Sequence, residues 1–204
     1  MDDEGQVIAV QPGRERTVEG FQKTLAGDVQ RFMDLRAKAL SGDAAAQVDF
    51  TLLKGELGWI PFEDLKKQLD GKELSGAQRQ QLGGLQANAL LAEVAKELAV
   101  AQNGDGFAVP AKKIVDAYAQ GLLPSGAERQ QQYLGIVFSY GLVQKDAALA
   151  RKAFDALKPV VKQMVGDDPR LAAWIREQED KIAALKDASA EDDEGIDEGC
   201  GEGK

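Results

Sequence analysis

The chain has 204 residues and a formal net charge of −9, from 34 acidic and 25 basic side chains. It contains one cysteine, Cys200, and no histidine. This excludes an intrachain disulfide, Cys/His zinc sites and catalytic triads that use an imidazole base. Seven acidic residues and one lysine lie from residue 191 onward, so this tail carries −6 and the body before it −3. A nearly neutral body argues against nucleic-acid binding, which needs clustered Lys and Arg.

The first predicted element is a short β-strand at Val7–Val10, bounded by turn signals at residues 3–5 and at Pro12-Gly13. An amphipathic helix follows from Thr17, with apolar residues recurring every three or four positions as far as Ala39.

These two elements resemble the last strand and the terminal helix of a thioredoxin fold, through residues 4–9, Gly13 and residues 17–25. The family's CxxC motif, its cis-proline and its first three strands have no counterpart in the chain. Thiol–disulfide activity therefore carries over to no residue. A lone strand cannot satisfy its backbone groups, so we expect residues 1–16 either to be mobile or to pair with a second copy in a homodimer.

The next region, Ser41 to Leu69, reads as two short helices joined by a tight connection at residues 58–61. Apolar residues recur at helical spacing on both sides of the connection, so the two stripes can face each other. The predicted stripes are Phe50, Leu53 and Leu57 on the first helix, and Phe62, Leu65 and Leu69 on the second. Ser41 or Asp43 is the predicted N-cap.

The beginning of this unit returns twice. The heptapeptides SGAQRQQ at residues 75–81 and SGAERQQ at residues 125–131 are nearly identical, and Ser41-Gly42 opens the first copy. Such self-similarity predicts an array of three stacked helical hairpins. Two reciprocal capping boxes are predicted, Ser75 with Gln78 and Ser125 with Glu128.

The second hairpin should break at residues 103–106 and resume with Pro110 in the first turn of its second helix. In the third hairpin, Gly141 is predicted to end the first helix and Asp146 to begin the second. Pro159 predicts a kink or an early stop near Lys158.

Asp168-Pro169 caps a last predicted helix. From Ala188 the sequence is acidic and rich in glycine, without an apolar pattern, so we expect disorder there.

As a group, the hairpins resemble tetratricopeptide repeats, with a longer spacing between helices than that family has. The third copy carries the likeness, at Leu134-Gly135, Phe138, Ala150, Phe154 and Leu157. The resemblance implies that a protein or peptide binds in a groove. Trp59, Tyr118, Tyr133 and Tyr140 are the candidate groove-lining residues, although aromatic residues at helical spacing are more often part of a core.

No catalytic residue, cofactor or metal site is predicted. Residues 103–106 have a faint likeness to a calcium loop, but Ala101 and Lys112 occupy positions that need ligands, which favours a simple turn. Acidic neighbours disfavour the thiolate of Cys200. Three carboxylates lie close together on the last helix, Glu177, Glu179 and Asp180. Arg176 and Lys181 are adjacent to them, which indicates a solvated face.

The sequence therefore predicts a mostly α protein with a thioredoxin-like remnant at residues 1–40, a hairpin array with a capping helix at residues 41–187 and a disordered acidic tail at residues 188–204. The predicted function is a non-catalytic protein- or peptide-binding module. Two alternatives stay open: the C-terminal accessory part of a thioredoxin-family oxidoreductase whose redox domain is missing from the chain, and a purely structural oligomerisation unit. No apolar run reaches membrane-spanning length. As written, the chain is expected to be soluble and cytoplasmic, or periplasmic if a leader was removed upstream.

Overall fold

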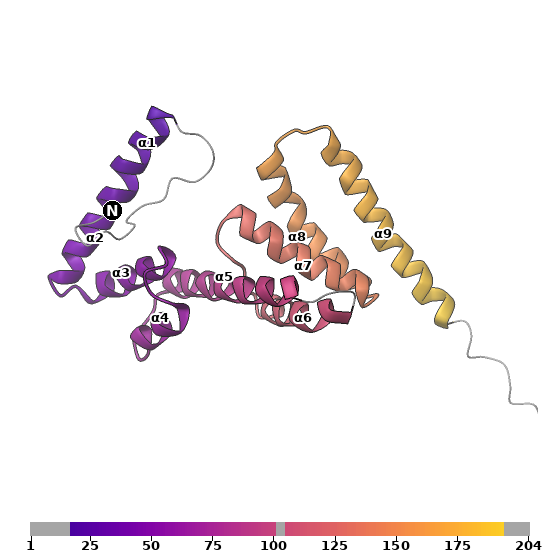
Figure 1. The fold of residues 1–204 in the computed structure, drawn as a ribbon, viewed down its shortest axis with the longest axis horizontal. Coiled ribbons are helices and arrows are strands. Elements are labelled where there is room, and N and C mark those ends of the chain that lie inside the picture. Colours follow the sequence, from indigo (N-terminus) through magenta and orange to yellow (C-terminus); the bar gives the residue numbers. More distant parts are fainter. Residues whose placement is uncertain (1–16, 101–104, 194–204) are drawn as a thin grey trace, which may run out of the picture. The chain divides into compact units, whose positions relative to one another are not determined.

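The computed structural model describes residues 17–100 and 105–193, and every regular element in these ranges is helical (Figure 1). The chain divides into two compact units, Met1–Gln86 and Ala87–Lys204, and each is described by itself. The predicted mostly α fold is confirmed. The predicted strand at Val7–Val10 lies outside the described residues. No helix in the described ranges is both long enough and apolar enough to cross a membrane.

Unit 1 begins with one continuous helical rod. It consists of α1 (Val18–Thr24), a π-helical turn (Leu25–Val29) and α2 (Gln30–Leu40). Thr17 Oγ1 accepts a hydrogen bond from the backbone N–H of Gly20 over 3.0 Å, so Thr17 opens the helix as predicted. The predicted helix is thus interrupted only by the wider π-helical turn.

The predicted first hairpin is confirmed as α3 (Ala44–Glu56) and α4 (Phe62–Leu69). Asp43, one of the two predicted N-caps, accepts a hydrogen bond from the backbone N–H of Ala46 over 3.0 Å. Of the first predicted stripe, Leu53 is buried, whereas Phe50 and Leu57 are only half-buried. The α3 residues in the core shared with α4 and α5 are Val48 and Leu52, whereas Phe50 is half-buried and faces Phe32 of α2. Because α3 is apolar on more than one side and contacts both α2 and α4, its spacing alone could not fix its orientation.

The long helix α5 (Gly76–Val100) starts with the predicted capping box. The Ser75 backbone N–H donates to Gln78 Oε1 over 2.8 Å, and the Gln78 N–H donates to Ser75 Oγ over 3.2 Å. The first part of α5 contributes Leu85 to the core of unit 1, and its second part contributes Leu91 and Val94 to the core of unit 2.

Unit 2 continues with α6 (Asp105–Ala119), α7 (Ala127–Val143), α8 (Ala147–Val165) and α9 (Arg170–Asp193). As predicted, Asp146 opens α8 by accepting from the Leu149 N–H over 2.8 Å, and Asp168 accepts from the Arg170 N–H before α9. One core joins α5 to α9. Its largest fully buried members include Tyr133, Phe154, Ile114 and Ile182.

The structure contradicts the predicted place of Pro110 and the early stop predicted as one of two outcomes at Pro159, while the kink at Pro159 stays a prediction. Because α6 begins at Asp105, Pro110 lies inside the helix and not in its first turn. Pro159 does not stop α8, which continues to Val165. A proline removes one backbone hydrogen bond, and the buried stripe on both sides of Pro159, from Ala153 to Val161, compensates for that loss.

Three further boundaries differ from the prediction. Gly141 does not end α7 but lies buried inside it. Ser125 is not an N-cap: α7 begins one residue later than the repeat implies, its N-cap Gly126 has φ 86°, and Ser125 Oγ instead accepts from Asn88 Nδ2 over 2.9 Å. The last helix extends through residues 188–193, which were predicted to be disordered, because Ala188 and Ala190 favour helix. Residues 194–204 lie outside the described ranges.

Candidate functional site

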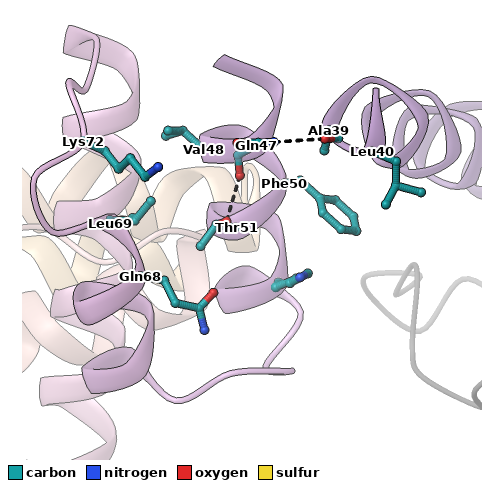
Figure 2. A pocket seen from close by; sticks show the side chains of 10 residues that line it. Ala39, Leu40, Gln47, Val48, Phe50, Thr51, Gln68, Leu69 and Lys72 are labelled. Atoms are coloured by element: carbon teal, nitrogen blue, oxygen red, sulfur yellow. Dashed lines mark hydrogen bonds between the residues drawn. The ribbon is translucent and has the colours of Figure 1, made fainter. Parts of the chain in front are cut away.

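A groove of about 400 Å³ lies on unit 1, where three helices meet (Figure 2). The C-terminal end of α2 forms one wall, and α3 forms the floor. The other wall is the C-terminal end of α4 together with Lys72, three residues beyond the helix. The lining residues are Ala39 and Leu40, then Gln47, Val48, Phe50, Thr51 and Lys54, and finally Gln68, Leu69 and Lys72.

The floor is one face of α3. Gln47, Phe50, Thr51 and Lys54 recur at the spacing that places side chains above one another on a helix. Thr51 Oγ1 donates to the backbone carbonyl of Gln47 over 2.8 Å, and Gln47 Nε2 donates to the carbonyl of Ala39 over 3.3 Å. The second bond joins α3 to α2, so it helps to hold the floor against the first wall (Figure 2).

The apolar part of the groove is anchored in an aromatic cluster. The Phe50 ring lies 5.5 Å from the ring of Phe32, and Trp59 lies edge-on to Phe32 at 5.4 Å. Phe32 is buried, whereas Phe50 is half-buried and forms part of the groove surface. Leu40 across from it is 78% exposed. An exposed leucine next to a fixed aromatic ring offers apolar surface that a ligand side chain can cover.

The charge of the groove is positive. Its two ionisable lining residues are Lys54 and Lys72, and no carboxylate lines it. The Lys54 ammonium lies 4.8 Å from the centre of the Phe50 ring, a cation–π contact. Among the described residues neither lysine forms an ion pair, whereas Lys67 of α4, outside the groove, pairs with Asp64 over 3.1 Å. The groove can therefore receive an anionic group without displacing one of the protein's own.

A second, polar hollow of about 550 Å³ lies beside the π-helical turn. Both basic and acidic side chains line it. Its carboxylates already have partners: Asp34 accepts from Gln30 Nε2 over 2.8 Å, and Asp49 accepts from Gln78 Nε2 over 2.6 Å. With its charges of both signs and its acceptors engaged, this hollow presents no single ligand chemistry. The first groove is the stronger candidate.

The four aromatic residues singled out from the sequence line neither hollow. Trp59 packs on Phe32 in unit 1. Tyr133 is buried in the core of unit 2, where its hydroxyl donates to the Ile114 carbonyl over 3.2 Å and burial raises its pKa to about 12. Tyr118 is half-buried beneath the ammonium of Lys152, and burial raises its pKa as well. Tyr140 is half-buried.

Of the three α9 carboxylates singled out from the sequence, Glu177 and Glu179 form solvated ion pairs, and Asp180 is exposed. Glu177 accepts from Lys181 over 2.8 Å, which lowers the pKa of Glu177. Glu179 approaches Lys158 at 3.5 Å and Arg151 at 3.8 Å, both on α8. Within the described ranges, no group of three or more His, Cys, Asp and Glu side chains could hold a metal ion. Cys200 and residues 103–104 lie outside those ranges.

Comparisons of the chain with protein-family models, curated proteins and solved structures found no significant match. The resemblances to thioredoxin and to tetratricopeptide repeats stay predictions. A function for the groove has to be argued from its own chemistry.

Proposed function

We propose that the protein is a non-catalytic peptide-binding module and that the groove on unit 1 is its binding surface. The observation that carries this proposal is the pairing of two apolar side chains, the exposed Leu40 and the half-buried Phe50, with two lysines that form no ion pair among the described residues, Lys54 and Lys72. Together these side chains offer a ligand both an apolar and an electrostatic contact.

The shape and size of the groove suit a short peptide. Its volume of about 400 Å³ falls in the range of roughly 300–1,000 Å³ that ligand sites occupy. Docking into a groove between helices is a common mode of peptide recognition. Gln47 and Gln68 add amide groups that can bond a peptide backbone.

The lysines favour a peptide that carries acidic residues beside a bulky apolar one. Because both ammonium groups face an open groove, each ion pair should add only about 0.2–1 kcal/mol to binding. Affinity should therefore rest mainly on the apolar anchor, and it should fall as salt screens the charges.

Selection of random displayed peptides on the full chain tests the proposal. Gln68 is exposed on the groove wall, so Gln68→Trp should fill the groove without disturbing the core. Gln80→Trp places the same bulk on an exposed position of α5 that does not line the groove. We expect the selected peptides to combine acidic and large apolar residues. They should bind the Gln80→Trp protein as they bind the wild type, and they should no longer bind the Gln68→Trp protein. Peptides that bind both variants equally would place recognition elsewhere.

A further inference from the structure

We propose that the groove on unit 1 receives the connection between α8 and α9 of a second copy of the chain. This inference rests on the proposed function, because it names a partner that carries the acidic and apolar groups expected of a groove ligand. The partner surface consists of Met164, Val165, Gly166 and Asp167, here called the α8–α9 corner. Its shape, its exposed apolar surface and its charge each match the groove.

Local hydrogen bonds hold the corner in shape. The α8 helix ends at Gly166, whose φ is 65° and whose N–H donates to the Lys162 carbonyl over 2.9 Å. The Asp168 carboxylate then accepts from the backbone N–H of Arg170 over 2.9 Å and from its guanidinium over 2.7 Å. Because α8 and α9 lie side by side, the chain reverses between them, which makes the corner a convex end of a helix pair (Figure 1). A turn fixed in this way loses little conformational entropy when a groove receives it.

The corner presents apolar side chains to solvent. Met164 is 43% exposed and Val165 is 47% exposed. Among the described residues they are the one pair of consecutive large hydrophobic side chains that are both exposed. On the groove side, Leu40 is 78% exposed beside the half-buried Phe50. Contact between the two surfaces would remove apolar area of both partners from water, which is favourable.

The charge of the corner complements the groove. Asp167 is exposed and forms no ion pair among the described residues. It follows Val165 by two residues, so a contact that covers Val165 brings this carboxylate to the groove, which holds Lys54 and Lys72 and no carboxylate. Lys162, one turn earlier on α8, is the exposed cation beside the corner. Lys162→Glu should therefore strengthen the association, because it places a second carboxylate near the two lysines.

The contact joins unlike surfaces of two copies, since the groove belongs to unit 1 and the corner to unit 2. Copies linked in this way form a closed ring or an open chain. Few side chains take part, so the interface should be small, and small interfaces are typical of weak, transient association. We therefore expect assembly to depend strongly on protein concentration.

Sedimentation velocity of the full chain over a concentration series tests the assembly. The wild type should associate as its concentration rises. Gln68→Trp blocks the groove, and Val165→Lys with Asp167→Lys removes an apolar group and reverses the charge of the corner, so each variant alone should remain monomeric. A mixture of the two variants should form dimers, because one supplies an intact corner and the other an intact groove. Val143→Lys with Gln144→Lys adds lysines at another exposed helix end and should leave the assembly intact.

Several outcomes overturn the inference. A wild type that stays monomeric at every concentration excludes the assembly, and association that persists in both variants places the contact elsewhere. A mixture that stays monomeric, or weaker association of Lys162→Glu, contradicts the pairing of corner and groove. Displayed peptides that require the groove, together with a monomeric wild type, would leave the proposed function standing without this inference. Assembly through the groove without any groove-dependent peptide would reject the proposed function and leave the groove as a contact between copies.

Discussion

Gly141 of α7 lies directly against the backbone of Ala150 in α8. A Cβ atom at Gly141 would sit 2.7 Å from the Ala150 nitrogen and 3.1 Å from the Ala150 Cβ. Both residues are buried. The glycine therefore acts as a packing residue that lets the two helices approach, which explains why a glycine stands inside a helix that it was expected to end.

Replacing Gly141 with alanine should destabilise unit 2. The added methyl group meets backbone atoms that cannot move aside, and overpacking of this kind costs about 1–3 kcal/mol, more than the gain of about 1 kcal/mol in helix propensity. Gly135→Ala is the matched control on the same helix, because a Cβ there meets nothing within 4 Å. It should raise the free energy of unfolding by about 0.5–1 kcal/mol. Urea titrations measure both effects. If the two substitutions shift the midpoint of unfolding in the same direction, this account is contradicted.

Four helices end in the same hydrogen-bonded motif, and one of them departs from the usual residue. After α2, α3 and α6 the left-handed position is a glycine: Gly42, Gly58 and Gly121, with φ between 76° and 92°. After α7 it is Lys145, with φ 56°. The Lys145 N–H donates to the Leu142 carbonyl and the Asp146 N–H to the Gly141 carbonyl, which defines a Schellman motif.

Lys145→Gly should therefore stabilise the protein. A side chain in the left-handed region costs roughly 1–2 kcal/mol, so its removal should raise the free energy of unfolding by about 1 kcal/mol after the greater freedom of glycine in the unfolded chain is subtracted. Gly121→Lys is the reverse exchange at an equivalent, exposed position, and it should lower stability by a similar amount. Thermal unfolding of the two variants checks the prediction, and equal melting temperatures would reject it.

The two copies of the SGAxRQQ heptapeptide differ in structure, and this difference can be measured. Ser75 caps α5 reciprocally with Gln78, so Ser75→Ala should lower the free energy of unfolding by about 0.5–2 kcal/mol. Ser125→Ala should cost less, because Ser125 does not cap α7 and its hydrogen bond with Asn88 Nδ2 is exposed, so water can replace the hydroxyl. The urea midpoints of the two variants, measured under the same conditions, test this difference. A larger loss for Ser125→Ala would mean that Ser125 caps α7 after all.

Helix positions were largely predictable because the signals for them are local. Thr17, Asp43, Asp146 and Asp168 each accept a backbone hydrogen bond at the helix start where the sequence placed them. The errors arose where packing between helices decides. Whether Gly141 ends a helix or packs inside it depends on Ala150, a residue of the next helix.

The candidate groove could not be found from sequence for the same reason. Its floor is the face of α3 that carries Phe50 and Lys54, and only the positions of α2 and α4 show that this face stays open. The sequence signal was a phenylalanine and a lysine four residues apart, which is common on helices. The four aromatic residues predicted to line a groove were chosen by residue type alone. Tyr133 then proved to be fully buried, which no property of the residue itself reveals.

Tyr133 gives a prediction in alkaline solution. Tyrosine ordinarily titrates near pH 10, and burial raises the pKa of Tyr133 in the folded protein to about 12. The phenol is therefore neutral in both states below about pH 10, and its contribution to stability is constant there. Between about pH 10 and about pH 12 the unfolded chain releases this proton while the folded protein retains it, so the free energy of unfolding must fall as pH rises.

Tyr133→Phe isolates this effect, because phenylalanine fills the same core site without a proton to release. Near neutral pH the variant should be less stable by about 0.5–1.5 kcal/mol, since the hydrogen bond to the Ile114 carbonyl is lost. Above about pH 10 the wild-type protein should lose stability faster, so the gap should narrow towards pH 12. Lysines, which ordinarily titrate at about pH 10.4, are common to both proteins, so their effect cancels in the difference. Denaturant titrations of both proteins across this range measure the gap. If it stays constant with pH, the Tyr133 phenol is not held neutral by burial in the folded core.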